Sequence, residues 1–372
     1  MDISKEMMAG KAPGLIGFSF DPQQAVLARD QKRLLSIRIE LNTTCNLQCR
    51  YCFSECSKRE PREVGFDNVR KVITEAADLN VESVIISGGG EPLLHSRFTD
   101  IISLIFDSGL RPVVFSNAML VTSELAAFLF DHEVSFMAKV DSLHPATQDS
   151  LAGVPGAYVG IQAGLHNLIQ AGFSRPEDPN LLRLGVCFVA NSRNINEIEE
   201  LWHFCRRNAI FPHIQLIYPD RCNGVDDLLL SFSEIKGLQQ RLHIIDREHY
   251  GYHWTSHTPF IAGECLQHFY SMYVTVNGDI RPCMYTNFDE HPFFWKDGRY
   301  PYNAFVGSIT QAYNAEPFVY ARSIDRYLEG KCSTCDCLPH CVGCRGYAYR
   351  SGIKQGLTPY QALRISCQLC GP

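Results

Sequence analysis

The sequence predicts an α/β fold, a partial (β/α)6 barrel of the TIM type followed by a small cysteine-rich domain. The first observation is an alternation of short apolar runs with helix-like periodicity between residues 34 and 217. The second is the uneven distribution of the 16 cysteines, of which four lie at residues 45–56 and nine at residues 265–370. The third is the composition of the 372-residue chain, 45% hydrophobic and 20% charged, which is typical of a globular protein with more than one domain.

Six apolar runs are predicted to be strands, and helical spacing separates them. In the first run, 34–41 (LLSIRIEL), polar residues alternate with apolar ones near the end. The helix predicted for residues 67–79 has Val69, Val72, Ile73 and Ala76 on one face. The other strands are predicted at 81–86, 112–115, 134–140, 182–190 and 213–217, and the other helices at 98–108, 123–131, 158–171 and 194–208. This alternation is typical of parallel barrels, whose active sites lie at the carboxyl ends of the strands.

The pattern changes after the sixth strand. A further helix is predicted for residues 233–247, and runs at 270–276 and 279–282 flank Asn277-Gly278, a strong hairpin signal. A tail rich in cysteine and glycine follows from residue 331. We therefore expect an N-terminal extension at 1–33, a barrel at 34–232, a linker helix region at 233–262 and a cysteine-rich domain at 263–372.

Charge and hydropathy argue against several classes of protein. The net charge of −6 and the pI near 6.1 disfavour a nucleic-acid partner. No apolar run approaches the roughly 18–20 residues of a membrane span. Residues 1–14 lack the apolar run of a secretory signal. We therefore expect a cytoplasmic protein without a membrane partner, in which clustered thiolates hold metal rather than form disulfides.

The cysteine loop after the first strand has the spacing C-x3-C-x2-C, formed by Cys45, Cys49 and Cys52. Three thiolates on one short loop can hold three irons of a cubane cluster and leave the fourth iron open for another ligand. Cys56 could instead complete a structural zinc site with four ligands. The position of the loop at the carboxyl end of a barrel strand favours the cluster.

These motifs resemble those of the radical S-adenosylmethionine (SAM) superfamily, over about residues 34–220. An aromatic, Tyr51, precedes the third cysteine, and Gly88-Gly89-Gly90-Glu91-Pro92 resembles the GGEP motif of the family. Ser116-Asn117 is similar to its TNG-like segment, with Ala118 in place of glycine. By this resemblance, the predicted SAM-binding residues are Tyr51, Gly88, Gly89, Gly90, Glu91, Ser116, Asn117 and Ser142.

The resemblance also implies the chemistry. SAM would bind the open iron, and one electron would release a 5′-deoxyadenosyl radical that takes hydrogen from an unactivated C–H bond. Because glycines carry no side chain, the backbone at residues 88–90 could approach the amino group of SAM closely. The cofactor supplies the difficult chemistry, while the protein supplies orientation and excludes water.

The second set of cysteines resembles the SPASM domain of radical SAM enzymes, over about residues 263–370. That domain usually binds two auxiliary [4Fe–4S] clusters, so three [4Fe–4S] clusters are expected in all. Two departures are a gap of two residues rather than three before Cys344 and the lack of one early cysteine found in some members. The C-x2-C pairs are also the signature of zinc ribbons, which are the alternative. The resemblance implies that Cys265, Cys283 and Cys344, with Cys337 as a further candidate, hold the first auxiliary cluster, and that Cys332, Cys335, Cys341 and either Cys367 or Cys370 hold the second.

Two residues are candidates for catalysis. Asp141 ends the fourth strand with Lys139 and Ser142, where these residues could contact SAM or substrate, or belong to an ordinary strand end with a helix cap. Cys187 shares one face of the fifth strand with Val189 and Asn191. If that face lines the barrel, the Cys187 thiol could return hydrogen to a substrate radical, as a cysteine does in radical SAM epimerases. The alternative is a small buried hydrophobic residue.

The resemblance implies a radical SAM oxidoreductase or maturase that modifies a peptide or protein by oxidation, cross-linking or epimerisation. A dehydrogenase or epimerase of a carbohydrate or aminocyclitol natural product is the alternative, and a non-catalytic metal-binding scaffold is the alternative of another class. The expected partners are the peptide or small-molecule substrate and an electron donor such as flavodoxin or ferredoxin. If the substrate is a peptide, a separate leader-peptide-binding protein is also expected, because about 33 residues before the first strand are too few for such a module with its own core; otherwise the substrate is of another kind.

Overall fold

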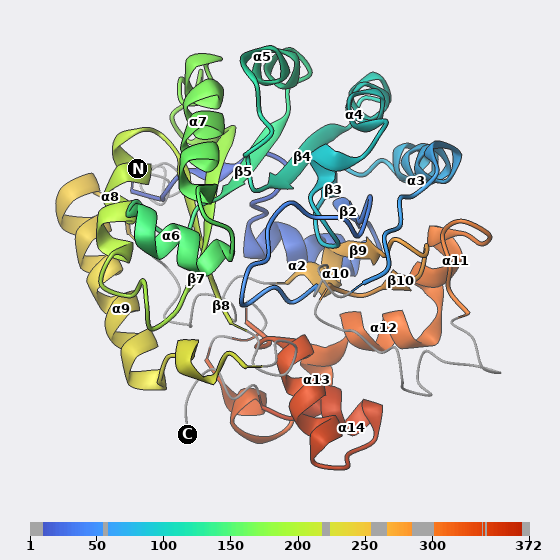
Figure 1. Ribbon diagram of the computed structural model, residues 1–372. Coiled ribbons are helices and arrows are strands. Elements are labelled where there is room, and N and C mark those ends of the chain that lie inside the picture. Colours follow the sequence, from blue (N-terminus) through green and yellow to red (C-terminus); the bar gives the residue numbers. More distant parts are fainter. Residues whose placement is uncertain are drawn as a thin grey trace, which may run out of the picture.

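The computed structural model describes residues 10–54, 59–217, 224–253, 266–284, 301–336, 338 and 341–366. Its centre is a curved sheet of eight strands in the order β10-β9-β2-β3-β4-β5-β7-β8 (Figure 1). Neighbouring strands are parallel except β9 and β10, which are antiparallel. The outer strands β8 and β10 do not pair with each other in the described chain, so the barrel is partial, as predicted.

The six predicted strands and the helices between them are confirmed. The strands are β2 (Ser36–Ile39), β3 (Ser83–Ile86), β4 (Arg111–Ser116), β5 (Ser135–Lys139), β7 (Leu184–Ala190) and β8 (Phe211–Leu216). The helices are α3 (Phe66–Asp78), α4 (Phe98–Asp107), α5 (Ser123–Asp131), α6 (Pro145–Ala152), α7 (Ala157–Gln170), α8 (Ile198–Arg207) and α9 (Phe232–Ile245). Of these, only α6 was not predicted; it is a short helix that begins at Pro145.

The two faces of the sheet belong to different clusters of apolar side chains. Alternate residues such as Ile37 and Val114 join the main core with residues of the surrounding helices, for example Val69 of α3. The opposite face belongs to a separate cluster that includes Met137 and Cys187. Because side chains alternate along a strand, this second cluster lines the inside of the partial barrel.

The N-terminal segment fills one end of this interior. The short strand β1 (Gly14–Leu15) pairs in parallel with β6 (Leu181–Leu182). The Phe18 ring then lies 5.2 Å from the Phe115 ring, and the Ser83 hydroxyl at the start of β3 donates to the Gly17 carbonyl oxygen at 2.6 Å. The segment therefore forms a floor near the amino ends of the strands, and α2 (Pro22–Asp30) follows it. Sequence reasoning did not predict this floor.

The C-terminal part both completes the sheet and packs below it in Figure 1. The predicted hairpin is confirmed by β9 (Ser271–Val274) and β10 (Ile280–Arg281), with Val274 opposite Ile280. β9 also pairs in parallel with β2, which the sequence did not predict, so the sheet crosses the boundary expected at residue 263.

The remaining helices are α10 (Gln267–Tyr270), α11 (Ile309–Asn314), α12 (Glu316–Arg322), α13 (Arg345–Lys354) and α14 (Pro359–Arg364), and a π-helical turn (Asp246–Tyr250) extends α9. Among the described helices, none has the length and apolar character needed to cross a membrane.

Candidate functional site

The cysteine loop lies at the carboxyl end of β2. Cys45, Cys49 and Cys52 are partly buried on it, and the Leu47 N–H donates to Cys45 Sγ at 3.4 Å. Such N–H contacts to sulfur are among the features that tune iron–sulfur clusters. Burial raises the pKa of the Cys49 thiol, as do Asp141 and the two other cysteines, while Lys139 acts in the opposite direction.

The donor set of this loop fits a cubane cluster with three protein ligands. Its three thiols are close enough for Cys45 and Cys52 to influence the titration of Cys49. In the part of the chain that the structure describes, no three His, Cys, Asp or Glu side chains converge as ligands of a single metal ion do. A cubane needs no such convergence, because each thiolate binds its own iron. When bound there, the cluster and SAM would supply the one-electron chemistry implied by the sequence motifs.

The glycine segment after β3 packs directly on the cysteine loop. The Gly90 N–H donates to the Asn42 carbonyl oxygen and the Glu91 N–H to the Thr44 carbonyl oxygen, both at 2.7 Å. A Cβ atom at Gly89 would lie 2.2 Å from the Asn42 oxygen, and one at Gly90 would lie 1.9 Å from the Thr44 oxygen. Both glycines are therefore required for contact between the two backbone segments. Their predicted contact with SAM stays a prediction.

Gly88 is constrained in a different way. Its φ of +84° lies in the left-handed region, and a Cβ atom there would lie 2.4 Å from the Tyr273 hydroxyl oxygen of β9. Glycine is thus required at this position by both backbone conformation and space.

Glu91 joins the glycine segment to the end of β4. Its buried carboxylate accepts hydrogen bonds from the Ser116 hydroxyl at 2.7 Å, the Asn117 N–H at 2.8 Å and the Leu93 N–H at 3.0 Å. Burial raises the pKa of Glu91 to about 6, although these hydrogen bonds act in the opposite direction. Three residues predicted to bind SAM, Glu91, Ser116 and Asn117, are therefore brought together. Their mutual contacts hold two neighbouring strand ends in place.

Asn117 also reaches the cysteine loop. Its side-chain amide donates to the Asn46 side-chain oxygen at 2.6 Å. The ends of β2, β3 and β4 are consequently connected by a continuous set of hydrogen bonds, which positions the three cysteines relative to the strand ends.

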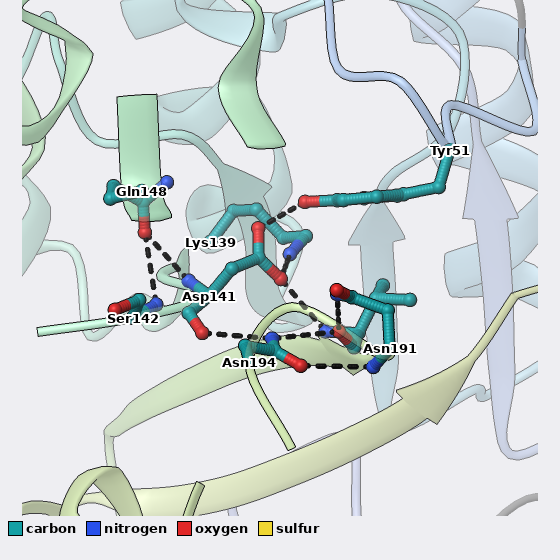
Figure 2. Close-up of polar contacts among 8 residues, drawn as sticks. Tyr51, Lys139, Asp141, Ser142, Gln148, Asn191 and Asn194 are labelled. Atoms are coloured by element: carbon teal, nitrogen blue, oxygen red, sulfur yellow. Dashed lines mark hydrogen bonds and ion pairs between the residues drawn. The ribbon is translucent and has the colours of Figure 1, made fainter. Parts of the chain in front are cut away.

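A second network, centred on Asp141, connects the same loop to β5 and β7 (Figure 2). The carboxylate of Asp141, which is 1% exposed, accepts hydrogen bonds from the Tyr51 hydroxyl, the Lys139 ammonium group and the Val189 N–H. The Lys139 ammonium group also lies 4.9 Å from the centre of the Tyr51 ring. Burial, together with the negative charge of Asp141, raises the pKa of Tyr51 well above its ordinary value.

The backbone at Asp141 is equally fixed. The side-chain oxygen of Gln148 accepts from the N–H groups of Asp141 and Ser142, and Asn194 donates to the Asp141 carbonyl oxygen (Figure 2). The Ser142 hydroxyl donates to Glu197. The sequence allows two interpretations of Asp141 and Ser142, contact with a ligand or an ordinary strand end. The structure adds a third function, because these residues connect β5 to the neighbouring loops.

Cys187 lies on the inner face of β7. Its predicted role as a hydrogen donor requires this position, because the donor must face the interior of the barrel. It is 4% exposed and belongs to the interior cluster with Ile85, Val113 and Met137. Burial raises the pKa of its thiol to about 12, so the group is protonated at neutral pH. It carries a hydrogen atom inside the barrel, and its hydrogen-donor role stays a proposal.

Five predicted auxiliary ligands fall within the described residues. Cys344 is buried just before α13, and Cys335 is exposed. The Gly343 N–H donates to Cys341 Sγ at 3.4 Å, the same contact as in the cysteine loop. The other two described ligands are Cys283 and Cys332, whereas Cys265, Cys337, Cys367 and Cys370 lie outside the described residues, as does Cys56.

Sequence reasoning missed two inward-facing polar residues, Arg38 of β2 and His213 of β8. Both contact the Phe18 ring, with the Arg38 guanidinium 5.8 Å and the His213 ring 5.1 Å from its centre. The sequence contains one sign that Arg38 faces the interior. In residues 34–41, Arg38 and Glu40 share one face of an otherwise apolar strand.

Comparisons with known proteins agree with this geometry. The model of the radical SAM superfamily matches residues 39–205, and that of SPASM, an iron–sulfur cluster-binding domain, matches residues 265–336. The AdoMet-dependent heme synthase of Nitratidesulfovibrio vulgaris is 25% identical, with 88% of this chain and 92% of the relative covered. The mycofactocin maturase MftC of Mycolicibacterium smegmatis is 28% identical, with 43% and 39% covered.

A solved structure shares the fold. Streptococcus suis SuiB bound to its precursor peptide SuiA has a TM-score of 0.69 and 18% identity, and the match covers 94% of this chain and 80% of SuiB. The cysteine loop at the end of the first barrel strand, the glycine segment packed on it and the two matching models lead to one conclusion: the chain contains a radical SAM domain, matched over residues 39–205, and a SPASM iron–sulfur domain, matched over residues 265–336.

Proposed function

We propose that this chain is a radical SAM enzyme that abstracts hydrogen from an unactivated C–H bond of a peptide or protein substrate. The observation that carries the proposal is the cysteine loop, whose three thiols are held at the barrel mouth by the glycine segment and the Tyr51–Asp141 contact. When bound, SAM and its cluster would supply the 5′-deoxyadenosyl radical.

The residues of the chain orient the reactants and limit the access of water. The floor formed by Gly14–Leu15 and Phe18 covers the amino end of the interior, which supports an entrance at the carboxyl end, where the cysteine loop lies. Tyr51 is held above this interior by Asp141, and Cys187 lies within it with its proton retained. We propose that a substrate enters from the loop side and that Cys187 returns hydrogen if the reaction is an epimerisation.

A peptide substrate is supported by the relatives. SuiB is solved with a precursor peptide, and MftC is named a maturase. The second candidate is a reaction on a small molecule, because the heme synthase of Nitratidesulfovibrio vulgaris matches this chain over almost its full length. For the peptide reaction we propose three [4Fe–4S] clusters, an electron donor such as flavodoxin or ferredoxin, a separate leader-peptide-binding protein and a cytoplasmic location.

The test begins with the enzyme reconstituted without oxygen and supplied with SAM and dithionite. We expect 5′-deoxyadenosine from the wild type and none above background from Cys49→Ala, with Cys205→Ala of α8 as a matched control that keeps activity. Iron analysis should give about twelve irons per chain for three clusters. No deoxyadenosine from a wild type that contains its clusters would overturn the proposal.

A further inference from the structure

Arg38 places a positive charge inside the partial barrel. The residue is only 4% exposed, and its guanidinium lies 5.6 Å from the centre of the Phe115 ring and 5.8 Å from that of Phe18. Phe115 lies on β4 and Phe18 belongs to the floor, so the guanidinium lies directly above the floor.

The charge of Arg38 has no acidic partner within ion-pair distance in the described ranges. Its Nη1 contacts Met284 Sδ at 3.3 Å, which is a weak acceptor. The two aromatic rings lie near the outer limit of about 6 Å for a cation–π interaction. A buried cation with such weak partners is unfavourable unless a further group compensates it.

The acidic groups nearest to it along the inner face have other partners. Glu40 accepts from the Tyr273 hydroxyl and from the Val276 N–H at 2.8 Å, and it lies 3.8 Å from Arg59. Asp141 accepts from Tyr51 and forms an ion pair with Lys139. Among the described residues, these two acidic groups are therefore engaged elsewhere, and Arg38 has no acidic partner of its own.

The inner face of β8, beside Arg38, is less completely buried than its outer face. On β8, the inward-facing side chains Phe211, His213 and Gln215 are half-buried, whereas the outward-facing residues between them are buried. His213 lies opposite Cys187 of β7, and Gln215 Nε2 is 3.2 Å from His213 Nε2. Burial and the charge of Arg38 lower the pKa of His213 to about 4, so its ring is neutral.

We propose that Arg38, with His213 beside it, is the anion-binding end of the substrate site, and that the substrate carries a carboxylate that binds there. This inference rests on the proposed function, because it assigns a substrate class to the same barrel interior. The single positive charge of Arg38 matches a monoanion, and the planar guanidinium can donate two parallel hydrogen bonds to a carboxylate. A neutral imidazole adds a hydrogen bond without adding charge.

The position of the site is consistent with the chemistry proposed for the barrel. Cys187 pairs in register with His213 on one side and with Lys139 on the other. A substrate held by its carboxylate at Arg38 would therefore place the neighbouring carbon atoms beside the Cys187 thiol. Met284, which contacts Arg38, directly follows the predicted auxiliary ligand Cys283.

The binding of small probe molecules tests the proposed carboxylate site without any reaction of the enzyme. The reconstituted enzyme with SAM is studied by ligand-observed saturation-transfer NMR, with propionate as the probe and propionamide as its neutral isostere. We expect saturable binding of propionate and none of propionamide. Binding of propionate should weaken at least tenfold in Arg38→Gln and less in Arg38→Lys, which keeps the charge. Arg322→Gln of α12 is the matched control, because Arg322 is also buried but lies over the Tyr313 ring, and it should bind like the wild type.

The carboxylate could belong to a peptide side chain or to a small acid. A second probe, a glutamate-containing tripeptide with both ends blocked, distinguishes between them. Binding of both propionate and the peptide, lost in Arg38→Gln, supports the site and assigns a peptide side chain. Binding of propionate alone supports the site and assigns a small acid. Equal propionate binding in wild type and Arg38→Gln, no binding in the wild type, or tighter binding of inorganic phosphate would overturn the proposal. Intact production of 5′-deoxyadenosine in that case would show that only the carboxylate site, and not the proposed function, has failed.

Discussion

The Tyr51 hydroxyl donates a hydrogen bond to the Asp141 carboxylate, and this contact joins the cysteine loop to the carboxyl end of β5 (Figure 2). The two residues are 90 positions apart in the sequence. The aromatic residue beside the third cysteine is therefore fixed in position by a buried acid and, through that acid, by Lys139 and the Val189 N–H.

Removal of the Tyr51 hydroxyl should loosen this connection. Because hydrogen bonds to charged groups contribute about 1.5–3 kcal/mol, Tyr51→Phe should lower the free energy of unfolding by about that amount. Asp141→Asn should have a similar effect, since Lys139 then lacks its counter-charge. A double-mutant cycle in urea measures the coupling between the two residues. Strictly additive effects would show that the contact contributes nothing.

Each cysteine of the loop should be essential for cleavage of SAM. Cys45→Ala, Cys49→Ala and Cys52→Ala should abolish formation of 5′-deoxyadenosine while the circular dichroism spectrum stays unchanged, because the thiols lie on a loop and are only partly buried. Deoxyadenosine formed by any of the three variants at the wild-type rate would remove that residue from the predicted ligands.

The glycine segment should not tolerate a methyl group. Gly90→Ala would place Cβ 1.9 Å from the Thr44 carbonyl oxygen, so the backbone must move. We expect a loss of about 1–3 kcal/mol in the free energy of unfolding, as for other overpacked sites, together with reduced affinity for SAM. Gly65→Ala is the matched control, because nothing lies within 4 Å of its added Cβ atom. Wild-type stability of Gly90→Ala would contradict the packing described here.

Stability should depend on pH through Glu91. Its pKa in the folded protein, about 6, lies above the ordinary value of 4.5, so the folded state binds this proton more tightly than the unfolded chain does. The carboxyl group therefore stabilises the fold most below pH 4.5, and this contribution decreases as the pH rises through 6. The change amounts to about 2 kcal/mol, given 1.36 kcal/mol per pKa unit.

Glu91→Gln isolates this effect. The amide oxygen can keep the Ser116 hydroxyl and the Leu93 N–H as donors, whereas the amide nitrogen then faces the Asn117 N–H. The variant should therefore fold but be less stable by an amount that does not itself depend on pH. The difference in the free energy of unfolding between wild type and variant, measured in urea from pH 4.5 to 7, should decrease with pH. A constant difference would mean that Glu91 does not titrate in this range.

Cys187→Ala separates hydrogen abstraction from hydrogen return. If the reaction is an epimerisation, the variant should still form 5′-deoxyadenosine but yield stalled or oxidised product, because no thiol hydrogen remains at that wall of the barrel. Product analysis by mass spectrometry in deuterated water provides the measurement, with Cys205→Ala as the control. The same product from variant and wild type would remove Cys187 from the mechanism.

Much of the fold could be predicted because its signals are local. The strands β2 to β8 are short apolar runs between amphipathic helices, and Asn277-Gly278 specifies the turn between β9 and β10. The parallel pairing of β9 with β2 could not be predicted, since a hairpin signal does not say which other strand lies next to it. The floor at Phe18 was missed for a related reason, because one aromatic residue outside any periodic segment gives no sign of what it packs against.

The sequence by itself determined the chemistry of the loop. Cys45, Cys49 and Cys52 are close in the chain, so their spacing, together with the position of the loop after the first predicted strand, predicts a cluster with an open iron. Only the tertiary structure decided which polar groups meet: that Glu91 bonds to Ser116 and Asn117, that Asp141 holds Tyr51, and that Arg38 has no acidic neighbour within ion-pair distance among the described residues. The physical reason is that a period of two along a strand fixes which residues share a face, whereas the compensation of buried charges depends on partners brought together from distant parts of the chain.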